Sequence, residues 1–554
     1  MPAVSRRRFD YSVPERWRHG IRPGARVRVP FHGRRVGAWV VEVGVTPPAG
    51  VEVRDLTGVS GWGPPRAVLE LAEWGAWRWA MPVATLLRSA SPERNVWSLP
   101  PRPDLGVARP ALGAGVTLRR LPPSEDLLPV VLEVIAASEP TGRAVLVLSP
   151  SIGWADRLAA RLRARGVDVA SSWAEAAAGW PVVVGSRAAA WTPVPTLGAA
   201  IVLDAHDYRD RYDAAEVAVE RATRDTAPCV LVSPCPTAVQ RVRYGPVEPG
   251  ERAAERAGWP AVTVVDRRGA DPRTGLFSEE LVHLSRSVLG RGGRLVCVLN
   301  RTGRARLLAC AACGALARCA VCGRAVESTA DSLVCRGCGA ERPVVCAECG
   351  SARMKALRVG VGRVREELEA LLGVPVGEVS GRPPHAPQEA DPGTSVLVGT
   401  EAVLHRVRHA AAVAFLDFDQ HLLAPRFGAG EEALALLVRA GRLVGGRARP
   451  GRPDTGIVMV QTRLPAHGVL RAAVAGDPEL FTDVELRREL RLPPFSALAT
   501  VRSDAMPVLE PVGAEVEVSR LEPGRWLARA PDHRTLCDAL GAIHGGVSVD
   551  PADI

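Results

Sequence analysis

The stretch AAIVLDAHD at residues 199–207 decides the fold class of this 554-residue chain, because its continuous apolar run is typical of a buried strand. Runs of the same kind stand at 144–150 (AVLVLSP), 181–186 (PVVVGS) and 229–234 (CVLVSP). The first of these is followed by WADRLAARLRARG, whose apolar residues recur at helical spacing. Strand runs that alternate with helices predict a parallel sheet covered by helices, which is an α/β domain.

A second series of the same kind follows and is interrupted by a cysteine-rich block. It begins with RLVCVLNRTG (294–303) and resumes after the block with SVLVGT (395–400), AVAFLDFD (412–419) and IVMVQT (457–462). The helical stretch EEALALLVRAGRLV (431–444) lies between the last two strand runs. We therefore expect a multidomain α/β protein with two lobes and a cysteine module inserted in the second.

Smaller parts flank the two lobes. ARVRVP (25–30) and VGAWVVEV (36–43) suit a small β-rich domain with one wet face, and a Trp-rich helical stretch follows at 68–87. The chain from about residue 465 onward mixes helical and strand-like stretches. The expected organisation is an N-terminal domain at 1–95, a linker at 96–112, a first lobe at 113–245, the start of the second lobe at 246–303, the cysteine module at 304–352, the rest of the second lobe at 353–464 and an α+β domain at 465–554.

The charge balance is mildly basic, since 70 Lys and Arg residues against 60 Asp and Glu residues give 70 − 60 = +10. Lys355 is the only lysine, so 70 − 1 = 69 of the basic residues are arginines. This excess permits a polyanionic partner without requiring one. The sequence has neither a signal-peptide core nor a run of about 18 apolar residues. We therefore expect a cytoplasmic protein with no membrane partner.

Eight of the 12 cysteines form four C-x2-C pairs between residues 310 and 349. In a reducing compartment this clustering indicates metal binding rather than disulfides. Each pair offers two thiolates to a tetrahedral ion, so eight thiolates predict two closed, structural Zn²⁺ sites. The spacing allows the pairs to combine in sequence order or in a nested order. Zinc ribbons bind DNA, bind protein or brace a fold, so the block leaves the function open.

Several stretches resemble the PriA (primosomal protein N′) family of replication-restart helicases: FDYSVP (9–14), RPGARVRVPF (22–31), LNRTGRARLLACAACG (299–314) and RLPPF (491–495), together with the four cysteine pairs. The resemblance covers nearly the whole chain. It implies a 3′-end DNA-binding domain at the N-terminus and two RecA-like lobes. It also implies nested zinc sites, with one ion on Cys310, Cys313, Cys346 and Cys349 and the other on Cys319, Cys322, Cys335 and Cys338.

The same resemblance implies a site for the 3′ end of a nascent DNA strand, lined by Phe9, Asp10 and Tyr11. The aromatic rings offer faces for the terminal base, and the Asp10 carboxylate can accept the proton of the 3′-hydroxyl. Gly33 lets the backbone approach the nucleotide, and Arg54 stands near where the family has a lysine. From the residues alone, the alternative is a strand edge whose aromatic rings lie in the core.

The motor motifs of the family are degenerate in this chain. LPPSEDLL (121–128) stands where the phosphate-binding loop belongs, and it contains neither lysine nor glycine. The acidic motif becomes LDAHD, which keeps Asp204 and Asp207 but has Ala205 in place of the glutamate expected to activate water. Three further motifs are altered, reading VSPCP (232–236), VGTEAVLHR (398–406) and VRAGRLVGGR (438–447, which keeps Arg442). We therefore expect lobes that persist as a scaffold, with ATP an unlikely cofactor and no enzymatic activity.

Three functions remain open at this level. The first is a restart protein that binds stalled or branched DNA forks and helps other primosome or replisome-loading proteins, without helicase activity and in association with the nucleoid. The second is an ATP-dependent 3′–5′ helicase with divergent motifs. The third is a zinc-ribbon protein adaptor without DNA affinity. The family's winged-helix domain is expected to be missing, because residues 96–112 are too few to form it.

Overall fold

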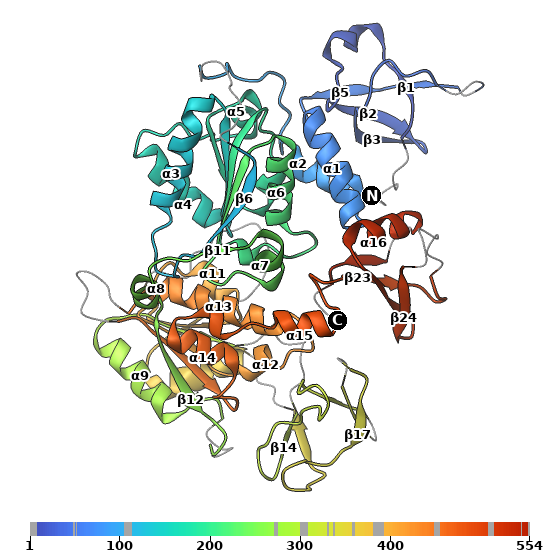
Figure 1. Ribbon diagram of the computed structural model, residues 1–554. Helices are drawn as coiled ribbons and strands as arrows, with labels where there is room; N and C mark the ends of the chain where they lie inside the picture. The colour runs from blue at the N-terminus through green and yellow to red at the C-terminus, as the bar shows by residue number, and fades with distance from the viewer. Residues whose placement is uncertain are drawn as a thin grey trace.

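The computed structural model describes residues 8–47, 50, 52–104, 113–270, 275–299, 308–329, 332–335, 338–356, 361–379, 393–447, 455–507, 515–543 and 546–551. Two six-stranded parallel sheets form the two lobes (Figure 1). The first runs in the order β11 (Val247–Glu248), β6 (Gly115–Arg119), β10 (Pro228–Val232), β9 (Leu197–Leu203), β7 (Ala144–Leu148) and β8 (Val182–Gly185).

Helices cover both faces of this first sheet. Alternate residues of each strand point to opposite sides, so the apolar strand residues form a core on each face. Leu146 and Leu148 pack with helices α1 (Arg66–Arg78), α2 (Val83–Ala90) and α6 (Ala214–Arg224). Val145 and Val147 pack on the other face, against α3 (Leu128–Ser138) and α4 (Ile152–Arg163). The short α5 (Trp173–Ala178) precedes β8. The α/β prediction is confirmed here.

The second sheet repeats this construction. Its order is β12 (Ala261–Asp266), β22 (Ile457–Thr462), β21 (Ala412–Phe415), β13 (Leu295–Val298), β20 (Val396–Gly399) and β19 (Val376–Val379). One face is covered by α9 (Glu279–Gly290) and α10 (Val361–Leu372). The other is covered by α11 (Val403–Arg406), α13 (Ala429–Val444) and α14 (Gly468–Ala475). Helix α12 (Asp419–Leu422) follows β21. Helix α7 (Ala238–Tyr244) lies between β10 and β11 of the first lobe, and α8 (Arg252–Gly258) lies between the last strand of the first sheet and the first strand of the second.

The structure moves two of the predicted boundaries and divides one predicted helix. Strand β11 pairs with β6, so the first lobe reaches past residue 245. Val469 and Leu470 of α14 are buried in the core of the second lobe, which therefore reaches past residue 464. The helical stretch at 68–87 forms two helices, since Pro82 lacks an amide proton and precedes the start of α2.

The N-terminal domain contains a three-stranded antiparallel sheet in the order β3 (Arg34–Trp39), β2 (Arg26–Phe31), β5 (Gly58–Gly61). A parallel pair of short strands, β1 (Tyr11–Ser12) and β4 (Arg54–Asp55), lies beside it. In β2, Val27 and Val29 are buried while Arg28 between them is exposed, as expected for a sheet with one wet face. His32 and Gly33 form the turn between β2 and β3, both with positive φ (46° and 74°), which is the type I′ geometry that favours glycine at the second position.

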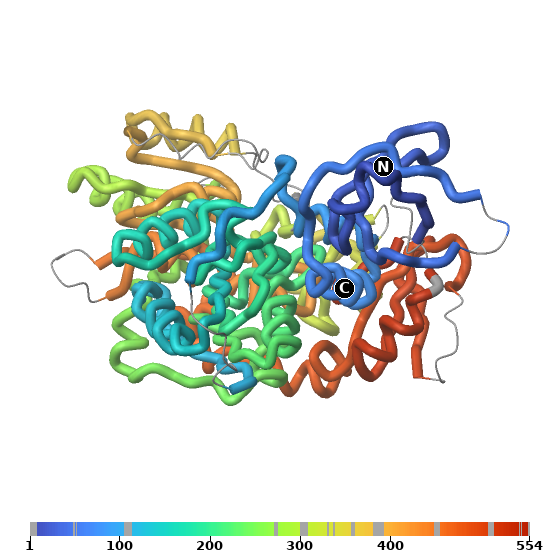
Figure 2. The backbone as a smooth tube through the Cα atoms, turned by 90° about the horizontal axis from the view of Figure 1, so that it is seen from above, coloured from blue at the N-terminus to red at the C-terminus, as the bar shows by residue number. Residues whose placement is uncertain are grey.

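The C-terminal domain is an antiparallel sheet in the order β24 (Glu517–Glu522), β25 (Arg525–Ala530), β23 (Ala497–Arg502), β26 (Val547–Val549), covered by α16 (His533–Ala539). It lies beside the N-terminal domain at one end of the molecule (Figure 2). Trp77 of α1 donates a hydrogen bond to Asp538 of α16 at 2.7 Å. The adjacent Arg78, 4% exposed, bonds both Glu216 of the first lobe and Asp550 of the C-terminal domain, so it joins three parts of the chain.

The cysteine module projects from the second lobe (Figure 1). Its strands are β14 (Leu308–Cys310) paired with β18 (Met354–Ala356), and β15 (Glu327–Ser328), β16 (Ser332–Val334) and β17 (Glu341–Pro343) in one sheet. Lys355 lies on β18, within this module and outside the first lobe. Among the helices that the structure describes, none has both the length and the apolar character needed to cross a bilayer.

Candidate functional site

The eight cysteine thiols of the module gather into two groups of four. One group contains Cys310, Cys313, Cys346 and Cys349, and the other contains Cys319, Cys322, Cys335 and Cys338. This is the nested grouping that the family resemblance implies. The sulfur–sulfur distances are 3.5 Å for Cys310–Cys349 and 3.6 Å for Cys313–Cys346. In the other group, Cys319–Cys338 and Cys322–Cys335 both measure 3.5 Å.

These groups fit metal ions with four thiolate ligands. Thiolates around one tetrahedral Zn²⁺ lie roughly 3.8 Å apart, given Zn–S bonds of about 2.3 Å. Each group already supplies four sulfurs, so no position is left for water and the sites suit a structural ion. Both groups can therefore hold a metal ion, and zinc as its identity stays a prediction.

A glycine after each cysteine pair shapes the loop that presents the thiols. Its φ lies in the left-handed region, and its amide donates to the carbonyl of the first cysteine of the pair at 2.9–3.0 Å. A residue with a side chain would be strained in this conformation. The repeated C-x2-C-G pattern is a sequence signal that the cysteine spacing alone did not use; the four glycines are Gly314, Gly323, Gly339 and Gly350.

A broad groove of about 1810 Å³ opens in the N-terminal domain, and Phe9, Asp10 and Tyr11 all line it. The Phe9 ring is 49% exposed and meets the edge of Phe31 at 5.2 Å between centroids. Phe31 in turn packs against His32 at 4.4 Å. Asp10 is exposed beside these rings. The groove thus offers an accessible aromatic surface and a carboxylate, the two features expected for a strand terminus.

Tyr11 has a more structural position than Phe9. Its ring packs against the small core of Val27, Val29 and Leu56, and its hydroxyl donates to the carbonyl of Pro30 at 3.0 Å. Burial raises the pKa of this hydroxyl, and the charge of Arg54 opposes that shift only in part. The core alternative therefore describes Tyr11, whereas Phe9 faces the groove.

Gly33 and Arg54 do not belong to the groove lining in the described part of the chain. Arg54 pairs with Tyr11 across the β1–β4 ladder and is exposed. A Cβ on Gly33 would meet no atom within 4 Å, so its conformation rather than crowding favours glycine. Sequence analysis missed other lining residues. The run RVRVPFHGRR (26–35) was the available signal for Phe31, His32 and Arg34, whereas Arg8, Trp77 and Arg88 lie outside it.

The degenerate loop 121–128 carries its own anion at the start of α3. Asp126 accepts a hydrogen bond from the Leu128 amide at 3.1 Å, where a phosphate-binding loop would present its amides to a nucleotide. Arg161 donates to both oxygens of this carboxylate, at 2.8 and 2.6 Å, and these bonds lower the pKa of Asp126. A carboxylate therefore bonds the first amide of α3, in the stretch that sequence analysis places at the phosphate-binding loop.

The two aspartates of the LDAHD stretch are paired with arginines of the second lobe. Arg442 donates to both oxygens of Asp204, and Arg439 donates to Asp207. Burial works to raise the pKa of Asp207, but the charge and hydrogen bond of Arg439, together with the charge of His206, outweigh it and the pKa is lowered. Ala205 is buried between them. Sequence analysis identified Arg442 but missed Arg439, which shares no local motif with Asp207.

A cavity of about 720 Å³ remains between the lobes, lined by both aspartates, both arginines and the 123–128 loop. Residues 300–307, which include all of the LNRTG stretch (299–303) except Leu299, lie outside the described residues, as does the linker segment 105–112.

Comparison with known proteins adds to this geometry. Residues 1–92 match the PriA 3′DNA-binding domain (3′BD). The chain is 30% identical to the replication restart protein PriA of Bacillus subtilis, over 58% of this chain and 43% of that protein. It is 28% identical to the Haemophilus influenzae protein of the same name, over 68% of this chain and 56% of the relative. The chain thus spans about half the length of these two relatives.

The probable replication restart protein PriA of Mycobacterium tuberculosis is similar over a longer stretch. It is 29% identical over 94% of this chain and 88% of its own length. A match to the 3′DNA-binding domain at the N-terminus and two mycobacterial relatives that align along nearly the whole sequence make this chain similar, almost throughout, to the PriA replication restart proteins.

Proposed function

We propose that this chain acts in replication restart by binding stalled or branched DNA forks at nascent 3′ ends and helping to reload the replisome, without an ATP-driven motor. The observation that carries the proposal is the groove of the N-terminal domain, where exposed Phe9 and Asp10 lie together in the segment that matches the 3′DNA-binding domain. The work of such a protein is done on the chromosome, in the nucleoid.

Recognition of a 3′ end follows from these two side chains. The Phe9 ring, supported at its edge by Phe31, offers a stacking surface for the terminal base. The Asp10 carboxylate accepts only, so it favours a free 3′-hydroxyl over a phosphate, which it would repel. Arginines that line the groove, such as Arg34 and Arg88, contribute sequence-independent attraction to the DNA backbone.

The proposed loss of the motor is supported by the state of the cleft. A P-loop nucleotidase needs amides and a lysine for the phosphates and a free acidic residue for Mg²⁺. Here Asp126 accepts a hydrogen bond from the first amide of α3, and Asp204 forms an ion pair with Arg442. The only lysine of the chain lies in the cysteine module. Nucleotide binding would have to displace several charge-assisted hydrogen bonds.

In this proposal the cysteine module has a structural role and supplies no catalytic group. Two Zn²⁺ ions, when bound, would hold its loops together, and the eight thiols would be their ligands. Its position on the second lobe leaves it as a surface for primosome or replisome-loading proteins, which are the partners we propose.

Two measurements on the full chain test this proposal. Fluorescence anisotropy compares forks whose nascent strand ends at the junction in a 3′-hydroxyl or in a 3′-phosphate, and we expect tighter binding to the hydroxyl. Equal, weak binding to both forks contradicts the proposed recognition. No retention on DNA near physiological salt supports the adaptor alternative. DNA-stimulated ATP hydrolysis that is abolished by Asp204→Ala supports the helicase alternative.

A further inference from the structure

We propose that the contact between the two lobes is a permanent internal clamp, in which ion pairs of the protein take the place of nucleotide and hold the lobes as one rigid block. The inference goes beyond the proposed function, because it concerns how the lobes are held and not what the chain binds. It rests on three separate sets of contacts along the seam between the lobes.

The first set joins helix α13 to the end of β9. The Arg442 side chain crosses the seam. Its Nε lies 2.7 Å from Asp204 Oδ2, and its Nη2 bonds Asp204 Oδ1. One turn earlier on α13, Arg439 lies on the same helix face and bonds one oxygen of Asp207. In RecA-like motors, arginines of the second lobe contact the γ-phosphate held by the first. The Asp204 carboxylate here supplies the anion for Arg442 from within the chain.

The second set is close packing of backbone across the seam. Arg442 also donates to the carbonyl of Pro123 at 2.8 Å. Gly441 faces Pro123 and Pro260 so closely that a Cβ there would lie 3.1 and 3.0 Å from their rings. A Cβ on Gly446 would lie 2.4 Å from the carbonyl oxygen of Ala257. The degenerate loop and helix α8 therefore pack directly against α13 at these points, beside the cavity of about 720 Å³ that remains between the lobes.

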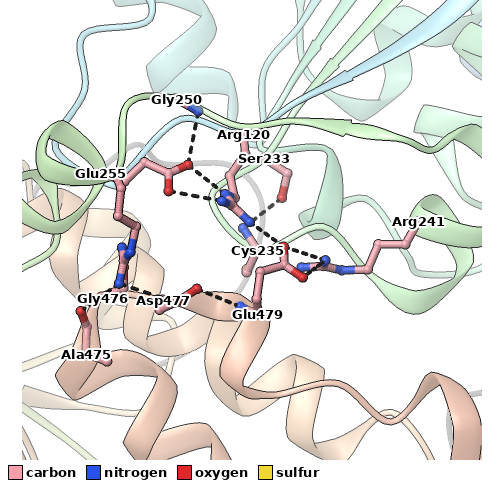
Figure 3. A network of polar contacts seen from close by, with 11 residues as sticks. Arg120, Ser233, Cys235, Arg241, Gly250, Glu255, Ala475, Gly476, Asp477 and Glu479 are labelled. Carbon is pink, nitrogen blue, oxygen red and sulfur yellow. Dashed lines mark hydrogen bonds and ion pairs between the residues drawn. The ribbon is translucent and has the colours of Figure 1, made fainter.

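The third set lies around Glu479, the middle residue of the 3-10 turn Pro478–Leu480 that follows α14 (Figure 3). Glu479 accepts from Arg241 of α7 at 2.7 and 2.6 Å and also pairs with Arg120, which follows β6. Arg120 is only 10% exposed and is fixed by a bidentate pair with Glu255 at 2.7 and 3.0 Å. This network ties the second lobe to the first through residues that are distinct from those of the α13 contacts.

Together these contacts explain why the clamp needs no ligand. Bidentate arginine–carboxylate pairs are among the stronger polar contacts in proteins. The Arg442–Asp204 and Arg120–Glu255 pairs are largely shielded from solvent, whereas the Glu479 side chain is 45% exposed. Opening the lobes would break both ion-pair sets and expose the packed loop at once. The relative placement of the domains attached to the lobes is then fixed on folding and does not follow a nucleotide cycle.

Hydrogen exchange measured by mass spectrometry on the full chain tests the clamp. The readout is the exchange rate of backbone amides in the seam segments 121–128, 203–208 and 436–446. In the wild-type chain, Mg²⁺ with ATP or with a non-hydrolysable ATP analogue should change these rates less than about twofold. Slower exchange of the seam amides on nucleotide addition would overturn the proposal, and this arm requires no variant.

Three variants complete the experiment. Arg442→Ala should accelerate exchange in the seam segments at least about tenfold, while β23 and β25 of the C-terminal sheet stay protected. The exchanged pair Asp204→Arg with Arg442→Asp should recover most of that protection. The matched control is Arg363→Ala, which removes an exposed ion pair with Glu367 on α10 of the same lobe. Seam exchange in Arg442→Ala equal to that of the control overturns the clamp. DNA binding and ATP hydrolysis, measured separately, report on the proposed function instead.

Discussion

Arg442 on helix α13 and Asp204 at the end of strand β9 form a bidentate ion pair across the two lobes, although 238 residues separate them in the sequence. Their side chains are 15% and 7% exposed. The guanidinium also bonds the Pro123 carbonyl and lies 5.1 Å from the Trp154 ring. Each of the two charged side chains has the other as its ion-pair partner and is largely shielded from water. Removal of either one therefore leaves the other charge buried and without this partner.

We expect Arg442→Ala and Asp204→Ala each to lower the free energy of unfolding by about 3 kcal/mol, because a buried charge loses its partner. The double variant should cost less than the sum of the two by at least about 1 kcal/mol, since no unpaired charge remains. Urea unfolding followed by tryptophan fluorescence measures all three. Arg363→Ala is the control and should change stability by less than about 0.5 kcal/mol, as its pair is exposed. Additive single effects would contradict a direct interaction.

The contrast between the two sides of this pair shows what the sequence can reveal. Strand β9 was predictable, because AAIVLDAHD is a continuous apolar run and parallel strands are buried on both faces. The partner of Asp207 was not, because Arg439 has no motif of its own and only the closure of two lobes brings it close. Likewise the cysteine spacing permitted two pairings, and the fold of the module selects the nested one.

The site at the N-terminus was predictable in part for a similar reason. Phe9 and Asp10 line the groove as the family resemblance implies, because the resemblance extends over that segment. Arg54 was proposed because it stands near where the family has a lysine, yet strand pairing sets it beside Tyr11 and outside the lining in the described part of the chain. The burial of Arg78 between three domains has no local signal at all, because its partners Glu216 and Asp550 come from distant parts of the chain.

Phe9→Ala should weaken binding to forks with a free nascent 3′ end by roughly 5- to 100-fold, because stacking of one base contributes about 1–3 kcal/mol. Fluorescence anisotropy at fixed salt measures the loss. Trp97→Ala is the matched control, since Trp97 is an aromatic residue that is 66% exposed and does not line the groove in the described part of the chain. Asp10→Asn should reduce the preference for a 3′-hydroxyl over a 3′-phosphate while retaining most affinity. An unchanged preference in Asp10→Asn contradicts the proposed role of the carboxylate.

Cys319→Ser should lower the zinc content from two ions per chain to about one, because three remaining thiolates hold the ion far less tightly. The core of the module is small, with Leu308, Val326 and Leu333 as its largest buried apolar members. Metal removal should therefore unfold the module and expose it to protease while the lobes stay intact. Metal analysis and limited proteolysis measure the two effects. Cys229→Ala, a buried thiol of β10 in the first lobe, is the control and should leave the zinc content unchanged.

The pH dependence of stability should carry the signature of Asp213, the N-cap of helix α6. Its carboxylate accepts from the amides of Ala215 at 2.8 Å and Glu216 at 3.3 Å. Burial, and next the charge of Glu216, raise the pKa of Asp213 to about 6. The folded state then binds this proton more tightly than the unfolded chain, so stability falls as pH rises from about 4 to 6 and is level above that range.

Asp213→Asn keeps an acceptor for the helix amides but has no charge to bury. Relative to wild type, the variant should gain about 1–3 kcal/mol of stability between pH 4.5 and pH 7.5, measured by urea unfolding at both values. Taking the difference between the two chains cancels the effect of acid on the zinc thiolates. Asp532, the N-cap of α16, is the control with the opposite sign: the Thr535 amide lowers its pKa, so its ionised form favours folding. Asp532→Asn should therefore lose stability relative to wild type only as pH rises through the range below about 4, and should change little between pH 4.5 and pH 7.5. A gain in Asp532→Asn parallel to that of Asp213→Asn in this window would refute the assignment to Asp213.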